Sequence, residues 1–159
     1  MTVTQQPAAI RMSMLSPVVT AAFGFVIYAL SVITGDVFGV NADARLEPAH
    51  THTLWEAVTE SAPEFAIGLV GVAIAVWAGR RAWRGQPSRL ARTAVILAGV
   101  AAVTLPVFWA GWSIVFGAVA VGLALECRHR VGSLGAGAGT ALILGSVAFA
   151  AAVAICVLG

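Results

Sequence analysis

The residues of this chain best suited to chemistry are carboxylates in regular register. Glu56, Glu60 and Glu64 follow one another at four-residue intervals, with His52 one turn earlier, so a continuous helix would place them on one face. A row of carboxylates at a membrane entrance can bind a cation or relay protons. A carboxyl group partly removed from water also holds its proton more tightly, as a general acid must. If the protein is an enzyme, we expect the catalytic residues to be Glu64, Glu60, Glu56 and Asp36.

Two of these glutamates also fit a structural role. Residues 53–56 (Thr-Leu-Trp-Glu) and 61–64 (Ser-Ala-Pro-Glu) each match the S/T-x-x-E capping box, in which the two side chains bond each other's backbone amides. The first box predicts a short helix over residues 54–60, lying on the membrane surface. The second predicts the start of the next helix, and Pro63 would break the helix between the two boxes. Capping is therefore the main alternative to catalysis, and Glu64, the most membrane-embedded acid, is the leading functional candidate.

His50 and His52 are the candidate metal ligands. An H-x-H pair in extended backbone places both imidazoles on one side, and Glu47 could add an oxygen ligand for zinc or copper. The alternative is a pair of solvated loop histidines. The chain has no Walker A sequence, no Rossmann fingerprint, no H-E-x-x-H and no G-x-S-x-G. We therefore expect no bound cofactor.

The composition indicates an integral membrane protein. Of the 159 residues, 60% are hydrophobic and only 10% are charged, whereas a soluble domain carries about 25% charged residues. The net charge of +2 is too small to indicate nucleic acid as a partner. All nine basic residues other than histidine are arginine, which suggests a GC-rich bacterial gene. We expect a multi-pass protein of the bacterial cytoplasmic membrane, with the lipid bilayer as its main partner.

An arginine-rich turn sets the orientation. Residues 79–92 (GRRAWRGQPSRLAR) carry five of the nine arginines between two long apolar runs, and arginines that flank membrane spans remain on the cytoplasmic side. The predicted fold is an all-α polytopic bundle in a single transmembrane domain, with the N-terminus inside, the C-terminus outside and residues 35–62 as an outer polar loop. Its five expected spans cover residues 17–34, 63–79, 93–108, 112–127 and 137–158.

The third and fourth spans come from one apolar run over residues 93–126. As a single helix its 34 residues would be about 51 Å long, against a hydrocarbon core of about 30 Å. Pro106 disrupts the helix and Gly111 permits a reversal, while Phe108, Trp109 and Trp112 suit an interfacial aromatic belt. Both halves are short, so we expect a hairpin that stops below full depth.

The first span begins with a helix-start signal, because Ser16 can cap it and proline follows at the first helical position. The alternative is a signal peptide cleaved after the A-x-A sequence at residues 42–44. We expect a retained helix, because the apolar core is long and the gap to the cleavage site is wide.

The last span carries a stripe of small residues at spacings of three and four, which lets helix backbones approach closely in lipid. We expect it to face Gly117, Val121 and Ala124 of the fourth span; the alternative is contact with a membrane protein partner or a second copy of the chain. The stripe consists of Gly137, Ala141, Gly145, Ala148 and Ala152.

Other polar groups have expected structural roles. Glu126 is expected to pair with an arginine, and Cys127 and Cys156 fall on opposite sides of the membrane, too far apart for a disulfide. The leading functional interpretation is a non-enzymatic accessory subunit or small transport component of a membrane complex. The alternative is an isomerase- or cyclase-type enzyme that uses the outer carboxylates on a lipophilic isoprenoid or polyketide.

Overall fold

The computed structural model describes residues 16–38 and 53–158, and within these ranges it consists of helices joined by short connections, with no strand. The predicted all-α class is therefore confirmed. The elements are α1 (Pro17–Phe38), α2 (Leu54–Glu60), α3 (Ala62–Trp83), α4 (Pro87–Val103), the 3-10 helix η2 (Leu105–Ala110), α5 (Trp112–Val131) and α6 (Ala136–Leu158).

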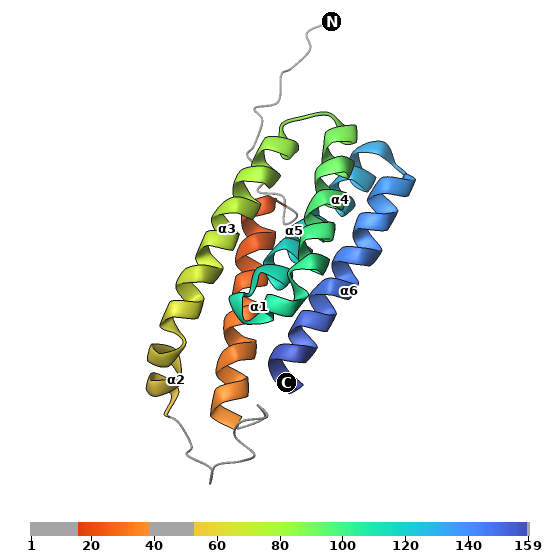
Figure 1. Cartoon of the computed structure of the whole chain (residues 1–159). Helices are drawn as coiled ribbons and strands as arrows, with labels where there is room; N and C mark the ends of the chain where they lie inside the picture. The colour runs from red at the N-terminus through yellow and green to blue at the C-terminus, as the bar shows by residue number, and fades with distance from the viewer. Residues whose placement is uncertain (1–15, 39–52, 159) are drawn as a thin grey trace, which may run out of the picture.

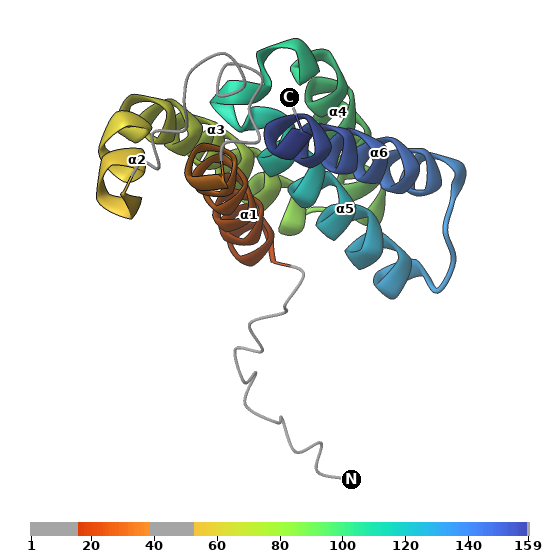
Figure 2. The ribbon, with the colours of Figure 1, turned by 90° about the horizontal axis from the view of Figure 1, so that it is seen from below.

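The helices form one bundle with two different ends (Figure 1). The start of α1, the α3–α4 connection and the α5–α6 connection lie at one end, which is called the arginine end below. The end of α1, α2 and the end of α6 lie at the opposite end (Figure 1). Viewed along the bundle, α2 lies at the periphery beside α3 (Figure 2).

Three helices are long and apolar enough to cross a membrane. Their apolar segments are Pro17–Thr34, Ala62–Trp83 and Ala136–Val157. Their outward side chains are large and apolar; Phe23 of α1 is 56% exposed and Leu69 of α3 is 54% exposed. A soluble protein rarely leaves such continuous apolar surface in water, so the exposed faces suggest contact with lipid.

The arginine-rich turn is shorter than expected. Helix α3 continues past residue 79 to Trp83, and α4 begins at Pro87 instead of residue 93, so only residues 84–86 connect them. Two physical reasons explain the difference. Arginine is a good helix former and is stabilised near a helix C-terminus by the helix dipole. Pro87 takes the first helical position, where its missing amide costs nothing.

The expected reversal between the third and fourth spans is present. Helix α4 ends at Val103 and not at residue 108, because Pro106 cannot donate the amide that a continuing helix needs. The 3-10 helix η2 follows, and Gly111 then adopts a left-handed conformation with φ of 69°. The Thr104 and Ser113 hydroxyls hydrogen-bond across the reversal at 3.0 Å, which links the two helices. The Thr104 hydroxyl also donates to the Val100 carbonyl at 2.9 Å.

The reversal stops short of the ends of α1 and α6 (Figure 1). Its Trp109 carbonyl accepts a hydrogen bond from the Tyr28 hydroxyl. Thr34, the last residue of the apolar segment of α1, lies six residues beyond Tyr28, or about 9 Å along the helix. The expected depth of the hairpin in the membrane stays a prediction.

Helix α5 is the centre of the bundle. It contacts α1, α3, α4 and α6, and its residues from Ser113 to Ala120 are all buried. Small side chains make this packing possible, because they let the neighbouring backbones approach closely. Gly71 of α3 leaves space for the Trp112 ring, since a Cβ there would lie 2.6 Å from the ring.

The small-residue stripe of α6 packs against α5 within the chain. A Cβ added at Gly145 would lie 3.3 Å from the Gly117 carbonyl oxygen and 3.4 Å from a Val121 methyl. Gly137 is exposed, and a Cβ added there would lie 3.8 Å from the Ala91 Cβ of α4, so Gly137 does not belong to this contact. The buried members of the stripe are Ala141, Gly145, Ala148 and Ala152.

Candidate functional site

Glu56 forms the first predicted capping box. Its Oε2 accepts hydrogen bonds from the Thr53 amide at 2.8 Å and from the Thr53 hydroxyl at 2.9 Å. The Glu56 amide donates back to the Thr53 hydroxyl at 3.4 Å. These bonds satisfy amides at the start of α2 that have no partner within the helix. The capping interpretation of Glu56 is confirmed.

The second capping box does not form at its serine. Ser61 keeps helical backbone angles, with φ of −80° and ψ of 0°, and makes no side-chain cap hydrogen bond. A capping residue needs extended backbone, whereas Ser61 is the single residue between α2 and α3 and its carbonyl accepts the Phe65 amide at 3.0 Å. The expected Ser61 cap was therefore wrong.

The row of carboxylates is divided between two helices. Glu56 and Glu60 lie on α2 and are exposed, whereas Glu64 lies in the first turn of α3 and is partly buried. The break expected near Pro63 falls at Ser61.

Glu64 lies close to two residues that the sequence did not connect with it. It is within electrostatic range of the Tyr28 hydroxyl and of the Cys156 thiol, both of which belong to buried side chains. Glu64, Tyr28 and Cys156 come from α3, α1 and α6, and are called the outer polar cluster below. Spacing could not reveal this cluster because its members are far apart in the chain.

Both the hydroxyl and the ring of Tyr28 are held in place by neighbouring residues. The hydroxyl donates to the Trp109 carbonyl in η2. The ring packs edge-on against Phe65, with 5.9 Å between ring centroids, and is tilted against Phe25 at 6.1 Å. The Tyr28 hydroxyl therefore gives a carbonyl of the irregular reversal a hydrogen-bond donor.

Three further candidate side chains lie outside the part of the chain that the structure describes. Asp36 lies on α1, but its side chain is outside the described residues, as are His50 and His52. The metal site expected at the two histidines therefore remains a prediction. Among the described residues, no group of three or more His, Cys, Asp or Glu could hold a metal ion.

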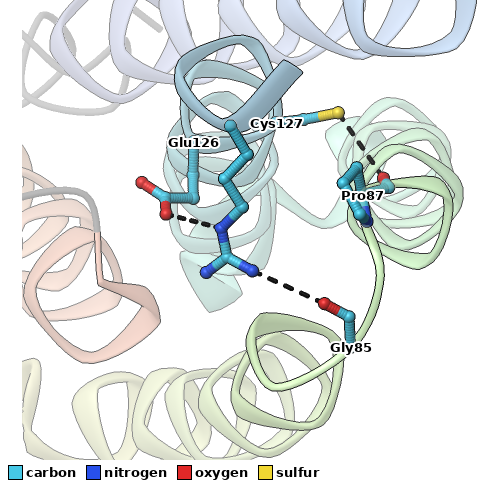
Figure 3. Close-up of polar contacts among 5 residues, drawn as sticks. Gly85, Pro87, Glu126 and Cys127 are labelled. Carbon is cyan, nitrogen blue, oxygen red and sulfur yellow. Dashed lines mark hydrogen bonds and ion pairs between the residues drawn. The ribbon is translucent and has the colours of Figure 1, made fainter.

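At the arginine end, Glu126 forms the expected ion pair. Its Oε1 accepts a hydrogen bond from Arg130 Nε at 2.8 Å, and Glu126 and Gly85 approach the same guanidinium in Figure 3. Arg130 Nη1 donates to the Gly85 carbonyl at 3.5 Å, and its Cζ lies 5.2 Å from the Trp83 ring centroid. Arg130 therefore joins the end of α5 to the α3–α4 connection.

Cys127 lies beside this ion pair and donates a weak hydrogen bond to the Pro87 carbonyl, with 3.5 Å between sulfur and oxygen (Figure 3). Cys127 and Cys156 are both free thiols, as the sequence predicted. The other basic side chains at this end are exposed: Arg80, Arg81, Arg84, Arg89, Arg92, Arg128 and His129.

Buried polar side chains in the described core have structural partners. The Ser31 hydroxyl donates to the Ile27 carbonyl at 2.8 Å, Ser113 bonds Thr104, and Glu126 bonds Arg130. No buried side-chain nitrogen or oxygen in the described ranges lacks a hydrogen-bond partner. Comparison with protein-family models, with curated proteins and with solved structures finds no match to this chain.

Proposed function

We propose that the chain is a five-span protein of the bacterial cytoplasmic membrane, with its N-terminus inside and its C-terminus outside. The distribution of charge supports this orientation, because seven of the nine arginines lie in residues 80–130, at the arginine end, and arginines flanking spans stay in the cytoplasm. Among the described residues, the only acid at that end is Glu126, which is paired.

Helices α4 and α5 supply the third and fourth spans. Helix α4 has 17 residues and α5 has 20, which correspond to about 26 and 30 Å and are comparable with a hydrocarbon core of about 30 Å. Helix α5 can span the membrane without an apolar lipid-facing surface, because the neighbouring helices separate it from lipid. The reversal between them lies near the outer interface, where the exposed Trp109 suits an aromatic belt.

Within that topology, we propose a non-enzymatic role as an accessory subunit of a membrane complex. The observation that carries this proposal is the filled centre of the bundle, where α5 is covered by four helices and the buried polar groups are engaged in structural hydrogen bonds. A transport path through one chain would have to displace α5. A role in which the apolar outer faces contact other membrane helices requires no such rearrangement.

The partner surface is expected on the outer faces of α1 and α3 and not on the small-residue stripe. Ala141, Ala148 and Ala152 are at most 1% exposed within one chain, so a partner would have to displace the helices that pack against α6, which include α4 and α5, to reach them. The outer faces of α1 and α3 carry large apolar side chains that remain accessible, including Val26, Leu30, Leu69 and Val70.

Native mass spectrometry of the protein, extracted gently from its own membrane, tests this role. A stable complex with another membrane protein is the expected result, and the partner's mass identifies it. Replacing Val26 and Leu30 together by alanine is expected to weaken the complex if the partner contacts α1. The matched control replaces Ile143 and Val147, which are at least as exposed on α6, and should leave the complex intact. A monodisperse monomer without a partner would contradict the accessory role.

The outer polar cluster favours a second candidate function, an enzyme acting on a lipophilic isoprenoid or polyketide. Glu64 would act as the acid–base group, because it is partly buried and lies within electrostatic range of Tyr28 and Cys156. This candidate predicts that the protein purifies as a monomer with a bound lipophilic molecule. Glu64→Gln should then abolish conversion of that molecule while leaving membrane insertion unchanged.

A further inference from the structure

The end of α3 carries the exposed Trp77 with Arg80 and Arg81, and Arg84 is the residue that follows the helix. Arg80 and Arg84 are four residues apart and Arg81 and Arg84 are three apart, so all three lie within one turn of each other, and all are exposed. Like charges at these helical spacings repel one another. The negative end of the helix dipole offsets only part of this repulsion. Trp77, Arg80, Arg81 and Arg84 are called the α3 basic cluster below.

The described part of the chain supplies no counter-charge to this cluster. Glu126, the one acid at the arginine end, is bonded to Arg130 at 2.8 Å. The other acidic side chains that the structure describes, Glu56, Glu60 and Glu64, lie on α2 and in the first turn of α3, at the opposite end of the bundle (Figure 1). An external anion would therefore meet no competing carboxylate at this cluster among the described residues.

The position of Trp77 indicates which kind of anion fits. Trp77 is 65% exposed on the apolar part of α3, about one turn nearer to the middle of the helix than the arginines. The Arg81 Cζ lies 5.9 Å from the centroid of the Trp77 ring, so its guanidinium stays close to the start of the apolar surface. The cluster thus presents positive charge beside an exposed aromatic ring, which suits a ligand with an anionic head and an apolar tail.

We propose that the α3 basic cluster binds the headgroup of an anionic phospholipid in the leaflet at the arginine end. The phosphate would bond Arg80, Arg81 and Arg84, and the glycerol and upper acyl chains would contact Trp77. Basic residues next to a membrane span attract anionic lipids in this way, and tryptophan occupies the headgroup level of the bilayer. The proposal requires that α3 crosses the membrane; it depends neither on the accessory role nor on the number of spans.

Lipid binding to the purified full-length chain in detergent tests the proposal. Native mass spectrometry would compare phosphatidylglycerol with phosphatidylcholine of identical acyl chains. The wild-type protein is expected to retain phosphatidylglycerol preferentially. Replacing Arg80, Arg81 and Arg84 together by glutamine is expected to lower the apparent affinity for phosphatidylglycerol by at least about fivefold, the factor that one arginine near an anionic surface supplies. Binding of phosphatidylcholine should not change.

A matched triple variant separates this cluster from the charge of the whole arginine end. Replacing Arg89, Arg92 and Arg128 by glutamine removes the same charge from exposed positions on α4 and α5, and is expected to leave most of the preference. An equal loss in both variants, or no preference in the wild-type protein, would overturn the proposal. If the first triple variant does not fold, Arg81→Gln and Arg84→Gln are measured singly; unchanged phosphatidylglycerol binding in both would overturn it as well.

Discussion

Gly117 of α5 and Gly145 of α6 bring the two helix backbones into direct contact. A Cβ placed on Gly117 would lie 2.9 Å from the Gly145 carbonyl oxygen and 3.2 Å from the Phe149 Cβ. Neither atom can move by rotation of a flexible side chain. The small-residue stripe therefore holds the central helix of this chain.

Gly117→Ala is expected to destabilise the protein by about 1–3 kcal/mol, because the added methyl group forces the two backbones apart. Gly99→Ala is the control, since a Cβ at Gly99 meets nothing within 4 Å. That substitution should be neutral, or stabilising by up to about 1 kcal/mol through helix propensity. Thermal unfolding in detergent, followed by circular dichroism, measures both. Equal stability of the two variants would contradict the close contact.

Gly111 and Gly132 provide a second matched pair. Both have positive φ, at 69° and 79°, but a Cβ at Gly111 would lie 2.6 Å from the Tyr28 ring, while a Cβ at Gly132 meets nothing within 4 Å. Gly132→Ala should lower the free energy of unfolding by only about 1–2 kcal/mol, the cost of placing alanine in left-handed backbone. Gly111→Ala should lose a further 1–3 kcal/mol or so from the clash. Similar unfolding temperatures for the two variants would show that Tyr28 does not pack on the reversal.

Tyr28→Phe is expected to lower the free energy of unfolding by about 1–3 kcal/mol, because the Trp109 carbonyl, in a partly buried hydrogen bond, loses its side-chain donor. The ring contacts with Phe65 and Phe25 remain, so the effect reports the hydroxyl. The same unfolding assay measures it, with protease sensitivity of the reversal as a second readout. An unchanged unfolding temperature would mean that water or another donor satisfies this carbonyl.

The ion pair at the arginine end should respond unequally to removal of its two partners. The Glu126 side chain is 10% exposed and that of Arg130 is 28% exposed. Arg130→Ala leaves a nearly buried carboxylate without its partner and is expected to cost roughly 2–4 kcal/mol. Glu126→Ala should cost less, because the arginine can reach water. The double variant should recover part of the stability that Arg130→Ala loses, because no carboxylate is then left without its partner. A double-mutant cycle measures this coupling between the two side chains. Strictly additive losses would contradict it.

Local signals in the sequence predicted the helix boundaries best at residues whose backbone chemistry permits only one local structure. Pro106 and Gly111 marked the reversal for this reason. The Val19 amide donates to the Ser16 hydroxyl at 3.4 Å, which confirms the cap expected before α1. The prediction of a side-chain cap at Ser61 was wrong because the same S-x-x-E pattern also occurs where the backbone stays helical between two helices. The length of the arginine-rich turn was overestimated because arginines were assigned to the loop, although they are good helix formers.

Contacts between different helices could not be predicted from the local sequence pattern. The sequence predicts an interfacial belt position for Trp112, which stays a prediction, but it did not reveal that the indole donates to the Ile67 carbonyl at 3.0 Å or that the ring fits over Gly71. The outer polar cluster was not predicted for the same reason. Glu64, Tyr28 and Cys156 lie on three helices, and their proximity depends on how those helices pack, which residue spacing along one helix does not encode.

The orientation of the bundle is the claim on which the proposed function depends, and cysteine labelling tests it most directly. Cys127 and Cys156 are first replaced by alanine, and single cysteines are then introduced by Trp55→Cys on α2 and Leu134→Cys in the α5–α6 connection, where both native side chains are exposed. In intact spheroplasts, a membrane-impermeant maleimide is expected to label Trp55→Cys at once and Leu134→Cys only after permeabilisation. Labelling of Leu134→Cys from outside, or protection of Trp55→Cys, would contradict the proposed topology.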